Sequence, residues 1–245
     1  MEEVYTSYVI PFRQYVMYDC FGGPRPVQIR YLINAQKGST FFVVLALMIY
    51  FDNWSWTAHI YLANHGIYGF IWLLKDITVP DKAWKAYLTI ASTIVAFVSL
   101  MIYWAAGYIV VAHGVEASPA VAAVAVMMNT LGSVLMMVTD TQKYFQLKYH
   151  HGLITDGWLT WSRNTNYLGE MMIYLSFALL ANHWLPYAWL AFIWTVLFMS
   201  NMIAKDVSIR NKDGGSAYMH KANLLFPNVV GWARSGVESR PAECS

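Results

Sequence analysis

Basic residues alternate with long apolar stretches along this chain, and this alternation restricts the possible folds more than any other feature. A membrane-spanning helix needs about 20 mostly apolar residues, and candidates lie at 40–51, 56–74, 86–112, 119–139, 166–181 and 185–203. All 16 Lys and Arg residues fall in the N-terminal segment, the loops after the second and fourth stretches, and the tail. Cytoplasmic loops are enriched in Lys and Arg. Six spans with both termini in the cytoplasm therefore account for every basic residue.

The composition agrees with a membrane protein, because 58% of the residues are hydrophobic and only 12% are charged, against about 25% charged in a soluble domain. We expect an all-α polytopic membrane protein with about six or seven transmembrane helices in a single domain, 1–245. Only Asn182-His183-Trp184 separate the last two spans, which predicts a C-terminal helical hairpin. The apolar residues 224–227 predict a re-entrant or interfacial tail.

The chain termini and net charge restrict the location and the partners. Met1-Glu2-Glu3 lacks the basic start of a signal peptide, so we expect the first transmembrane helix to direct insertion. The expected location is the endoplasmic reticulum in a eukaryote or the inner membrane in a bacterium. A net charge of +2 gives no reason to expect nucleic acid as a partner. Cys20 and Cys244 have no metal-site spacing, and we expect no metal.

Polar residues inside apolar spans are costly and are therefore candidates for function. Asn129, Ser133, Asp140 and Lys143 are spaced to share one helix face, which predicts a polar cavity that opens to the cytoplasm. For Asn129 and Ser133, contact between helices is the favoured alternative, because Ser and Asn often join membrane helices.

A second polar face is predicted at the start of the fifth span. Arg163, Asn166, Tyr167 and Glu170 follow the i, i+3, i+4, i+7 pattern. A buried carboxylate needs a cation or hydrogen-bond donors, and Arg163 is the nearest cation in sequence, with Lys143 as an alternative from the neighbouring helix. An ion pair that joins two helices and a site for an anionic or hydroxyl-rich ligand explain this pattern about equally well.

The second span carries an aromatic stripe of Tyr61, His65, Tyr68 and Trp72. His65 and Tyr68 are candidate catalytic residues, because a neutral His and a Tyr can polarise a carbonyl group and deliver a proton. Ordinary aromatic packing is the favoured explanation when the stripe is considered alone. In the tail, Asp206 and Arg210 lie one turn apart, as in a common exposed ion pair.

Three segments resemble the C-terminal family of steroid 5-alpha-reductases (DUF1295-like), which is related to sterol C14 and delta-7 reductases. They are Asp140-Thr-Gln-Lys143, Gly152 to Trp158, and Ser162-Arg-Asn-Thr-Asn-Tyr-Leu-Gly-Glu170. The later Asp206, Tyr218 and Phe226-Pro227 also match this family's order. The resemblance divides the domain into helices on the lipid-substrate side, 1–128, and a cofactor-binding half, 129–230.

The resemblance implies NADPH-dependent reduction of a carbon–carbon double bond in a steroid, sterol or isoprenoid drawn from the bilayer. It places Lys143 at the phosphates, Trp158, Asn166 and Tyr167 along the cofactor, and Asp140 and Glu170 at the nicotinamide ribose or carboxamide. Further residues of this predicted cofactor set are Arg163 beside Asn166, and Asp206, Arg210 and Tyr218, which would close the site.

Some positions depart from the family pattern. Thr165 replaces a common Pro, Leu147 replaces a basic residue, and Asn64-His65 stand where steroid reductases have a Gln-Glu pair, so the resemblance supports the cofactor better than a steroid substrate. One alternative is an S-adenosylmethionine-dependent methyltransferase acting on isoprenylcysteine or phospholipid, although its Glu-Glu pair is replaced by Lys205-Asp206. Another is a non-catalytic relative that binds lipid. The oligomeric state stays open.

Overall fold

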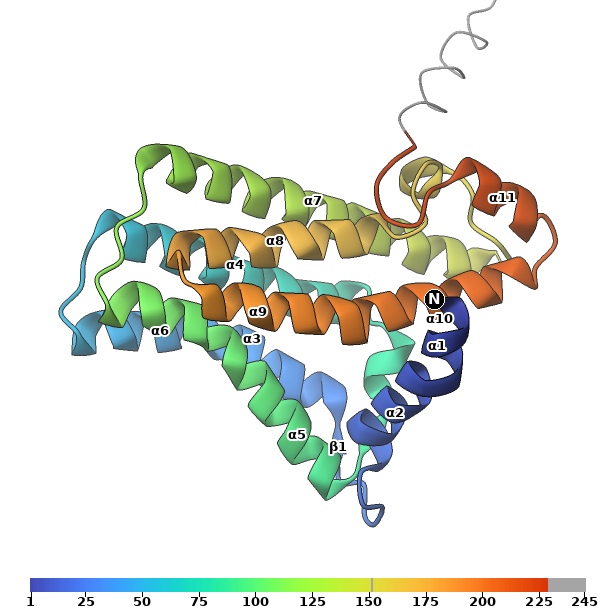
Figure 1. The fold of residues 1–245 in the computed structure, drawn as a ribbon, viewed down its shortest axis with the longest axis horizontal. Coiled ribbons are helices and arrows are strands. Elements are labelled where there is room, and N and C mark those ends of the chain that lie inside the picture. The colour runs from blue at the N-terminus through green and yellow to red at the C-terminus, as the bar shows by residue number, and fades with distance from the viewer. Residues whose placement is uncertain (151, 229–245) are drawn as a thin grey trace, which may run out of the picture.

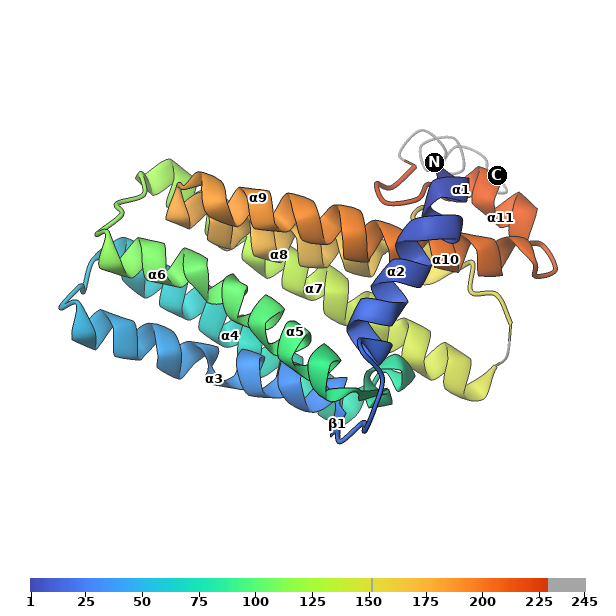
Figure 2. The same cartoon turned by 60° about the horizontal axis from the view of Figure 1, so that its bottom comes forward.

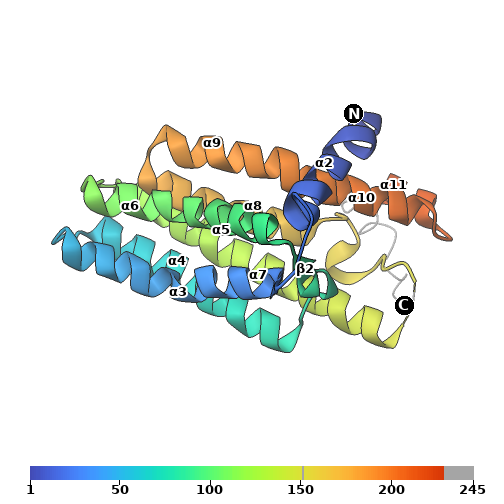
Figure 3. The same cartoon turned by 90° about the horizontal axis from the view of Figure 1, so that it is seen from below.

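The computed structural model describes residues 1–150 and 152–228 and is mostly helical. The long helical segments lie side by side in an elongated bundle (Figures 1 and 3). They are α3 (Ile29–Tyr50), α4 (Trp56–Thr78), α5 with α6 (Ile90–Met101 and Ala105–Ala112, joined by the 3-10 turn η4, Ile102–Trp104), α7 (Pro119–Tyr149), α8 (Thr165–Ala181), and α9 with α10 (Trp184–Ile193 and Met199–Arg210, joined by the π-helical turn η6, Trp194–Phe198).

The surface of this bundle is apolar where a soluble protein would be polar. Exposed Phe42, Phe70, Phe97, Leu131 and Phe192 come from five different segments, whereas His65, Lys37 and Gln36 are buried inside. Within residues 1–150 and 152–228, four helices are long and apolar enough to cross a membrane: Ile29–Tyr50, Ile90–Ala112, Pro119–Tyr149 and Trp184–Arg210. Helices α4 and α8 are not among these four, and α8 has only 17 residues. The count of six spans therefore stays a prediction.

Several helices extend beyond the apolar stretches from which they were predicted. Helix α3 begins at Ile29 rather than at residue 40, so Lys37 lies inside it. Lys75 lies in the last turn of α4, and Lys205 lies inside α10. Lys37, Lys75 and Lys205, which lie outside the predicted apolar stretches, are therefore inside helices that extend past those stretches. Polar contacts between helices allow these extensions, since Arg30 of α3 bonds Asp76 of α4 at 2.7 Å.

The ends of the helices follow from local capping. The side chains of Ser55, Thr89 and Ser118 accept hydrogen bonds from backbone N–H groups in the first turns of α4, α5 and α7, as N-capping residues do. Asn182 adopts the left-handed conformation that ends α8, and the His183 ring accepts from Leu185 N at the start of α9. The two-residue linker Asn182-His183 thus forms the hairpin predicted for the last two long helices.

An N-terminal helical segment, absent from the predicted spans, crosses the outside of the bundle (Figure 2). It comprises α1 (Glu2–Val4), η1 (Tyr5–Val9), α2 (Ile10–Gln14) and η2 (Tyr15–Asp19). Tyr5 donates to Thr195 O at 3.0 Å, and Ser92 Oγ donates to Val16 O at 2.9 Å. The segment therefore joins the last long helix to α5. Next, β1 (Val27–Gln28) pairs antiparallel with β2 (Tyr87–Leu88).

Two helix crossings require glycine because the backbones approach very closely. A Cβ on Gly169 of α8 would lie 2.5 Å from Gly132 O of α7, and a Cβ on Gly132 would lie 2.5 Å from Gly169 O. At the crossing of α3 and α4, a Cβ on Gly69 would lie 2.1 Å from Lys37 O. Small residues at such contacts are typical of membrane helices. These crossings set the depth of Lys37 and the relative positions of α7 and α8.

We expect Gly169→Ala to destabilise the protein by about 1–3 kcal/mol, as overpacking does, because the new methyl group would meet backbone atoms of α7. Gly38→Ala is the matched control, since its methyl group would meet only the flexible end of Leu73 at 3.0 Å. Thermal unfolding of both variants in mild detergent measures the difference. Equal unfolding temperatures would contradict the close crossing.

Candidate functional site

A loop that joins α7 to α8 lies across one end of the bundle. It contains the 3-10 turn η5 (Gly157–Leu159) and is held by Gln142 of α7, which accepts from Trp158 N at 2.8 Å and donates to Asp156 O at 2.9 Å. Thr165 Oγ1 donates to Trp158 O at 2.8 Å. The hydroxyl of Thr165, which stands in place of the family's Pro, therefore tethers the loop to α8. The Trp158 side chain remains half exposed.

Arg163 connects this loop to α10 and to α11 (Gly215–Lys221). Its guanidinium donates to both carboxylate oxygens of Asp206, at 2.8 and 2.7 Å, and also to the carbonyl oxygens of Met219 and Ala222. Both charged side chains are largely buried. Arg163, one of the two cations considered for Glu170, is therefore excluded as its partner, because Arg163 binds Asp206 in the bidentate geometry that a planar guanidinium and a carboxylate favour.

Residues 222–225 return along the same loop and complete its hydrogen bonds. Asn164 donates to Leu224 O at 2.9 Å, Ser162 donates to Leu225 O at 2.7 Å, and Arg163 N donates to Asn223 O at 2.9 Å. The chain after α11 thus packs on the Arg163 segment. The predicted cytoplasmic C-terminus falls in 229–245, outside the described residues.

Tyr218 of α11 is buried against the loop and donates from its hydroxyl to Leu159 O at 2.6 Å. Burial raises the pKa of Tyr218 to about 12, so the hydroxyl keeps its proton at neutral pH and remains a donor. Tyr218 therefore holds η5 in place, as Arg163 holds the segment after it.

Arg210 lies away from this network. It donates to both carboxylate oxygens of Glu2 at 2.9 and 2.8 Å, and both side chains are about half exposed. The predicted Asp206–Arg210 pair is therefore wrong, because each residue has another partner. Arg210 instead joins the last long helix to the N-terminal segment.

The remaining charged groups of the predicted site converge where α4, α7, α8 and α10 end. Asp140 of α7 forms an ion pair with Lys75 of α4. The charges of Lys75, Asp140 and Lys37 act on Glu170 of α8, and those of Lys143, Asp140 and Asp206 act on Lys205. The Lys205 ammonium also donates to Arg163 O. Asp140 and Lys143 of one sequence motif and Glu170 of another thus lie in one electrostatic neighbourhood, together with Lys75 and Lys205.

Two predicted cofactor residues in this neighbourhood keep their bonding groups free within residues 1–150 and 152–228. Lys143 forms no ion pair there, and Asn166 makes no side-chain hydrogen bond. Tyr167 instead turns toward the last long helix, where it packs on Phe198 with ring centroids 4.9 Å apart. Lys143 and Asn166 are therefore the groups most available to a ligand.

The aromatic stripe of α4 faces the interior of the bundle, and Tyr61, His65, Tyr68 and Trp72 are all buried. His65 Nδ1 lies 2.8 Å from the Tyr61 hydroxyl, and its ring stacks on Phe177 with centroids 4.1 Å apart. In the described part of the chain, His65 Nε2 has no hydrogen-bond partner. The Tyr68 hydroxyl lies 3.1 Å from that of Tyr174.

Lys37 was missed as a site residue because it was assigned to the N-terminal segment. It is only 2% exposed, and its ammonium donates to the Tyr174 hydroxyl at 2.8 Å. Four aromatic rings surround the ammonium at 4.3–5.4 Å from their centroids: Tyr68, Trp72, Tyr103 and Tyr174. The spacing of Lys37, Thr40, Val44 and Met48, all buried on one face of α3, is the sequence signal that could have revealed it.

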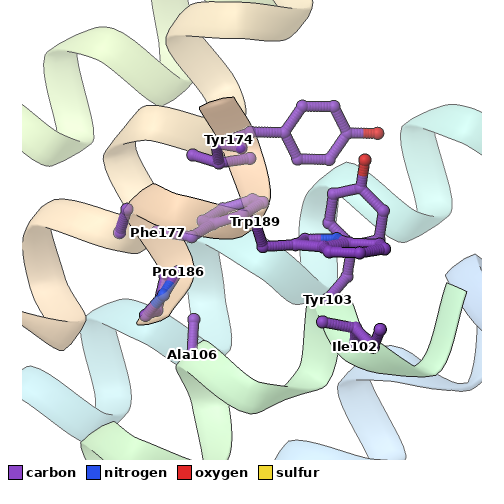
Figure 4. Close-up of a pocket in the computed structure, with 9 residues that line it drawn as sticks. Ile102, Tyr103, Ala106, Tyr174, Phe177, Pro186 and Trp189 are labelled. Atoms are coloured by element: carbon purple, nitrogen blue, oxygen red, sulfur yellow. The ribbon is translucent and has the colours of Figure 1, made fainter. Parts of the chain in front are cut away.

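A small, mostly apolar pocket lies beside this cluster, between η4 and α6 on one side and α8 and α9 on the other (Figure 4). Tyr103 and Tyr174 contribute neighbouring aromatic rings, with Trp189 beside them, and Ala106, Phe177 and Pro186 lie opposite. The cavity volume is about 20 Å³, enough for about one water molecule. Binding a sterol would therefore require the helices to separate.

We expect Asp206→Ala to lower the free energy of unfolding by about 3–5 kcal/mol, because it leaves the buried Arg163 guanidinium without its carboxylate. Asp19→Ala is the control, since the Asp19–Arg25 pair is about half exposed and such pairs contribute about 0–1 kcal/mol. Thermal unfolding in detergent compares the two variants. Similar losses in both would show that the Arg163–Asp206 contact does not hold the loop.

Comparison with known proteins gives one family and no individual relative. No curated protein and no solved structure matches this chain. The family described as "Protein of unknown function (DUF1295)" matches residues 70–226, which includes the α7–α8 loop, the Arg163 segment and α10 and α11. Because this match extends over more than half of the sequence, the chain belongs to the DUF1295 family.

Proposed function

We propose that this protein is an integral membrane reductase that uses NADPH to reduce a carbon–carbon double bond in a steroid, sterol or isoprenoid-like substrate. The observation that carries the proposal is that Asp140 acts electrostatically on both Glu170 and Lys205, and Lys143 on Lys205, at one end of an apolar bundle. Asn166 lies one helical turn before Glu170 on α8. Asp140, Lys143, Asn166 and Glu170 belong to the motifs that resemble steroid 5-alpha-reductases, and the family match includes them together with Lys205.

The donor set fits a phosphate-bearing dinucleotide. Lys143 supplies a cation without a bound carboxylate among the described side chains, and Lys205 adds a second positive charge nearby. Cations of this kind bind phosphate. The exposed indole of Trp158 offers an apolar face, and Asn166 and Glu170 offer groups for ribose hydroxyls or a carboxamide. NADPH would supply the hydride to such a site.

Arg163, Asp206 and Tyr218 take a different part in this proposal from the one the resemblance implies. Their functional groups bind one another or backbone carbonyls, so we assign them to holding the loop that carries Trp158. Arg210, paired with Glu2 on the surface, would reach the cofactor only after this pair separates.

The proposed topology has six spans and both termini in the cytoplasm. Helices α4 and α8 run beside the four apolar helices (Figure 1), and their buried polar residues face the interior rather than lipid. Lys143, Lys205 and Arg210 lie at the bundle end that also carries α11 and the N-terminal helix. Placing this end in the cytoplasm satisfies the positive-inside rule and gives the site access to soluble NADPH.

The first functional prediction concerns the choice of cofactor. NADPH should raise the unfolding temperature of the purified protein, because a ligand that binds only the folded state stabilises it, whereas S-adenosylmethionine should not. Protection by S-adenosylmethionine alone would refute the reductase and favour the methyltransferase. Protection by neither, together with retained lipid binding, would favour the non-catalytic relative.

The second functional prediction locates the cofactor. Asn166→Ala and Lys143→Ala should each weaken NADPH binding about tenfold or more, because hydrogen bonds to charged groups contribute about 1.5–3 kcal/mol. Lys148→Ala is the matched control, since Lys148 is exposed on the same helix. Fluorescence titration with NADPH measures the dissociation constants. Unchanged binding in both site variants would place the cofactor elsewhere.

A further inference from the structure

The N-terminal helical segment, residues 2–19, has both of its ends held on the same side of the bundle. Near its start, Glu2 binds Arg210 in the last turn of α10. Near its end, Val16 O accepts a hydrogen bond at 2.9 Å from Ser92 Oγ in the first turn of α5. The end of α10 and the start of α5 both lie on the cytoplasmic side of the proposed topology. The segment therefore begins and ends at one membrane surface.

The direction of the segment agrees with this placement. As a helix, residues 2–19 extend about 27 Å, which is close to the hydrocarbon thickness of about 30 Å. The segment is thus nearly long enough to cross a bilayer, yet it runs across the direction of the long helices (Figures 1 and 2). If the long helices cross the membrane, this segment lies along its surface.

One face of the segment is apolar and exposed. Val4, Tyr8, Phe12 and Tyr15 are 46–73% exposed, and their spacing of four, four and three residues places them on one helix face. We call these four residues the apolar stripe. Two of them are tyrosines, whose rings favour the boundary between lipid and water.

The rest of the segment carries little charge and divides into two further faces. Residues 4–18 contain a single charged side chain, Arg13, which is only partly exposed because it donates to Asn201 of α10. Glu3, Ser7 and Gln14 are exposed and follow the i, i+4, i+11 spacing of another face. An apolar face and a separate polar face are typical of a helix that lies at a membrane surface.

Contacts with the bundle prevent the apolar stripe from turning inward. The bonds to α10 at the start and middle of the segment, and to α5 at its end, fix its rotation about its own axis. A stripe that the bundle does not cover therefore needs a partner from outside the chain.

The neighbouring surface shows what this partner is. Helix α5, on which the end of the segment packs, belongs to Ile90–Ala112, one of the helices that are long and apolar enough to cross a membrane. Its Ile94, Phe97 and Val98 are 47–59% exposed, as expected for side chains in contact with lipid. Because the segment packs at the start of this helix, the leaflet that covers α5 also reaches the apolar stripe.

We propose that residues 2–19 form an interfacial helix that binds the phospholipid surface of the cytoplasmic leaflet. The apolar stripe inserts among the headgroups and the adjoining acyl chains, while Glu3, Ser7 and Gln14 face water. This inference rests on the membrane topology proposed above and does not depend on the reductase activity. Through the Glu2–Arg210 pair, the inserted helix holds the end of α10 at the membrane surface.

The test is site-directed fluorescence of the full-length protein in phosphatidylcholine nanodiscs. In a background with Cys20→Ser and Cys244→Ser, an NBD label is attached at Tyr8→Cys or Phe12→Cys. Lipids that carry a nitroxide near the headgroup should quench both labels more strongly than lipids that carry it near the chain ends, because an interfacial helix inserts only about 5–10 Å.

Ser7→Cys and Gln14→Cys are the matched control positions on the polar face of the same segment. Iodide in the aqueous phase should quench labels at these two positions about three times or more as strongly as labels on the apolar stripe, since only the stripe is inserted. All four side chains are exposed, so the cysteines should leave the unfolding temperature unchanged.

Three results would overturn the proposal. Equal iodide quenching on both faces would show that the stripe lies in water. Protection from iodide without quenching by either lipid would show that protein, such as a second copy of this chain, covers the stripe. Stronger quenching of the stripe by nitroxides near the chain ends would show a segment that enters the bilayer core.

A label at Val98→Cys separates this inference from the topology on which it rests. Val98 is exposed on α5, inside the proposed span, and its label should be quenched by nitroxides on the lipid chains. If the label at Val98→Cys is quenched but those at Tyr8→Cys and Phe12→Cys are not, the interfacial helix fails and the topology stands. If iodide rather than lipid quenches the label at Val98→Cys, the proposed topology fails as well.

Discussion

The close crossing of α7 and α8 determines the relative positions of most groups in the candidate site. Gly132 and Gly169 remove the side chains that would separate the two backbones. Asp140 and Lys143 lie two and three turns after Gly132 along α7, and Asn166 and Glu170 flank Gly169 on α8. A larger separation would divide this set into two unrelated groups. The small residue of the Tyr-Leu-Gly-Glu segment is therefore as necessary to the site as the polar residues around it.

Burial of polar groups in an apolar bundle imposes the second constraint, because each group needs a partner where water is scarce. The structure meets this need by connecting helices that are distant in sequence: Arg30 with Asp76, Lys75 with Asp140, and Arg163 with Asp206. These pairs lie toward the end of the bundle that holds the α7–α8 loop. The interior beyond them has Lys37 and the aromatic stripe of α4, whose hydroxyl and imidazole groups bond mainly to one another.

Sequence periodicity predicted which residues share a helix face better than it predicted which residues bind each other. The aromatic stripe of α4, the polar stripe of α7 and the hairpin of α8 and α9 follow from spacing alone, since helix geometry fixes which residues share a face. The bonding partner of Arg163 could not be predicted, because Asp206 is 43 residues away in the sequence. No rule about local spacing selects Asp206 over Glu170. The N-terminal helix and the start of α3 were missed because Pro11, Arg13 and Arg30 interrupt the apolar runs. Contacts with other helices stabilise those segments instead.

Glu170 connects the proposed cofactor site electrostatically with the buried cluster around Lys37. It lies one helical turn before Tyr174 on α8, and the charges of both Lys75 and Lys37 act on it. Lys75 is bound to Asp140 in the cofactor neighbourhood, whereas Lys37 is bound to Tyr174 beside the apolar pocket. A single carboxylate thus contributes to the electrostatic environment of both regions. If a cofactor changes the charge near Asp140 and Glu170, the field at Lys37 must change too, because charges in a low-dielectric interior are weakly screened. Cofactor binding would then change the electrostatic environment of the buried aromatic cluster around Lys37 without any movement of α8.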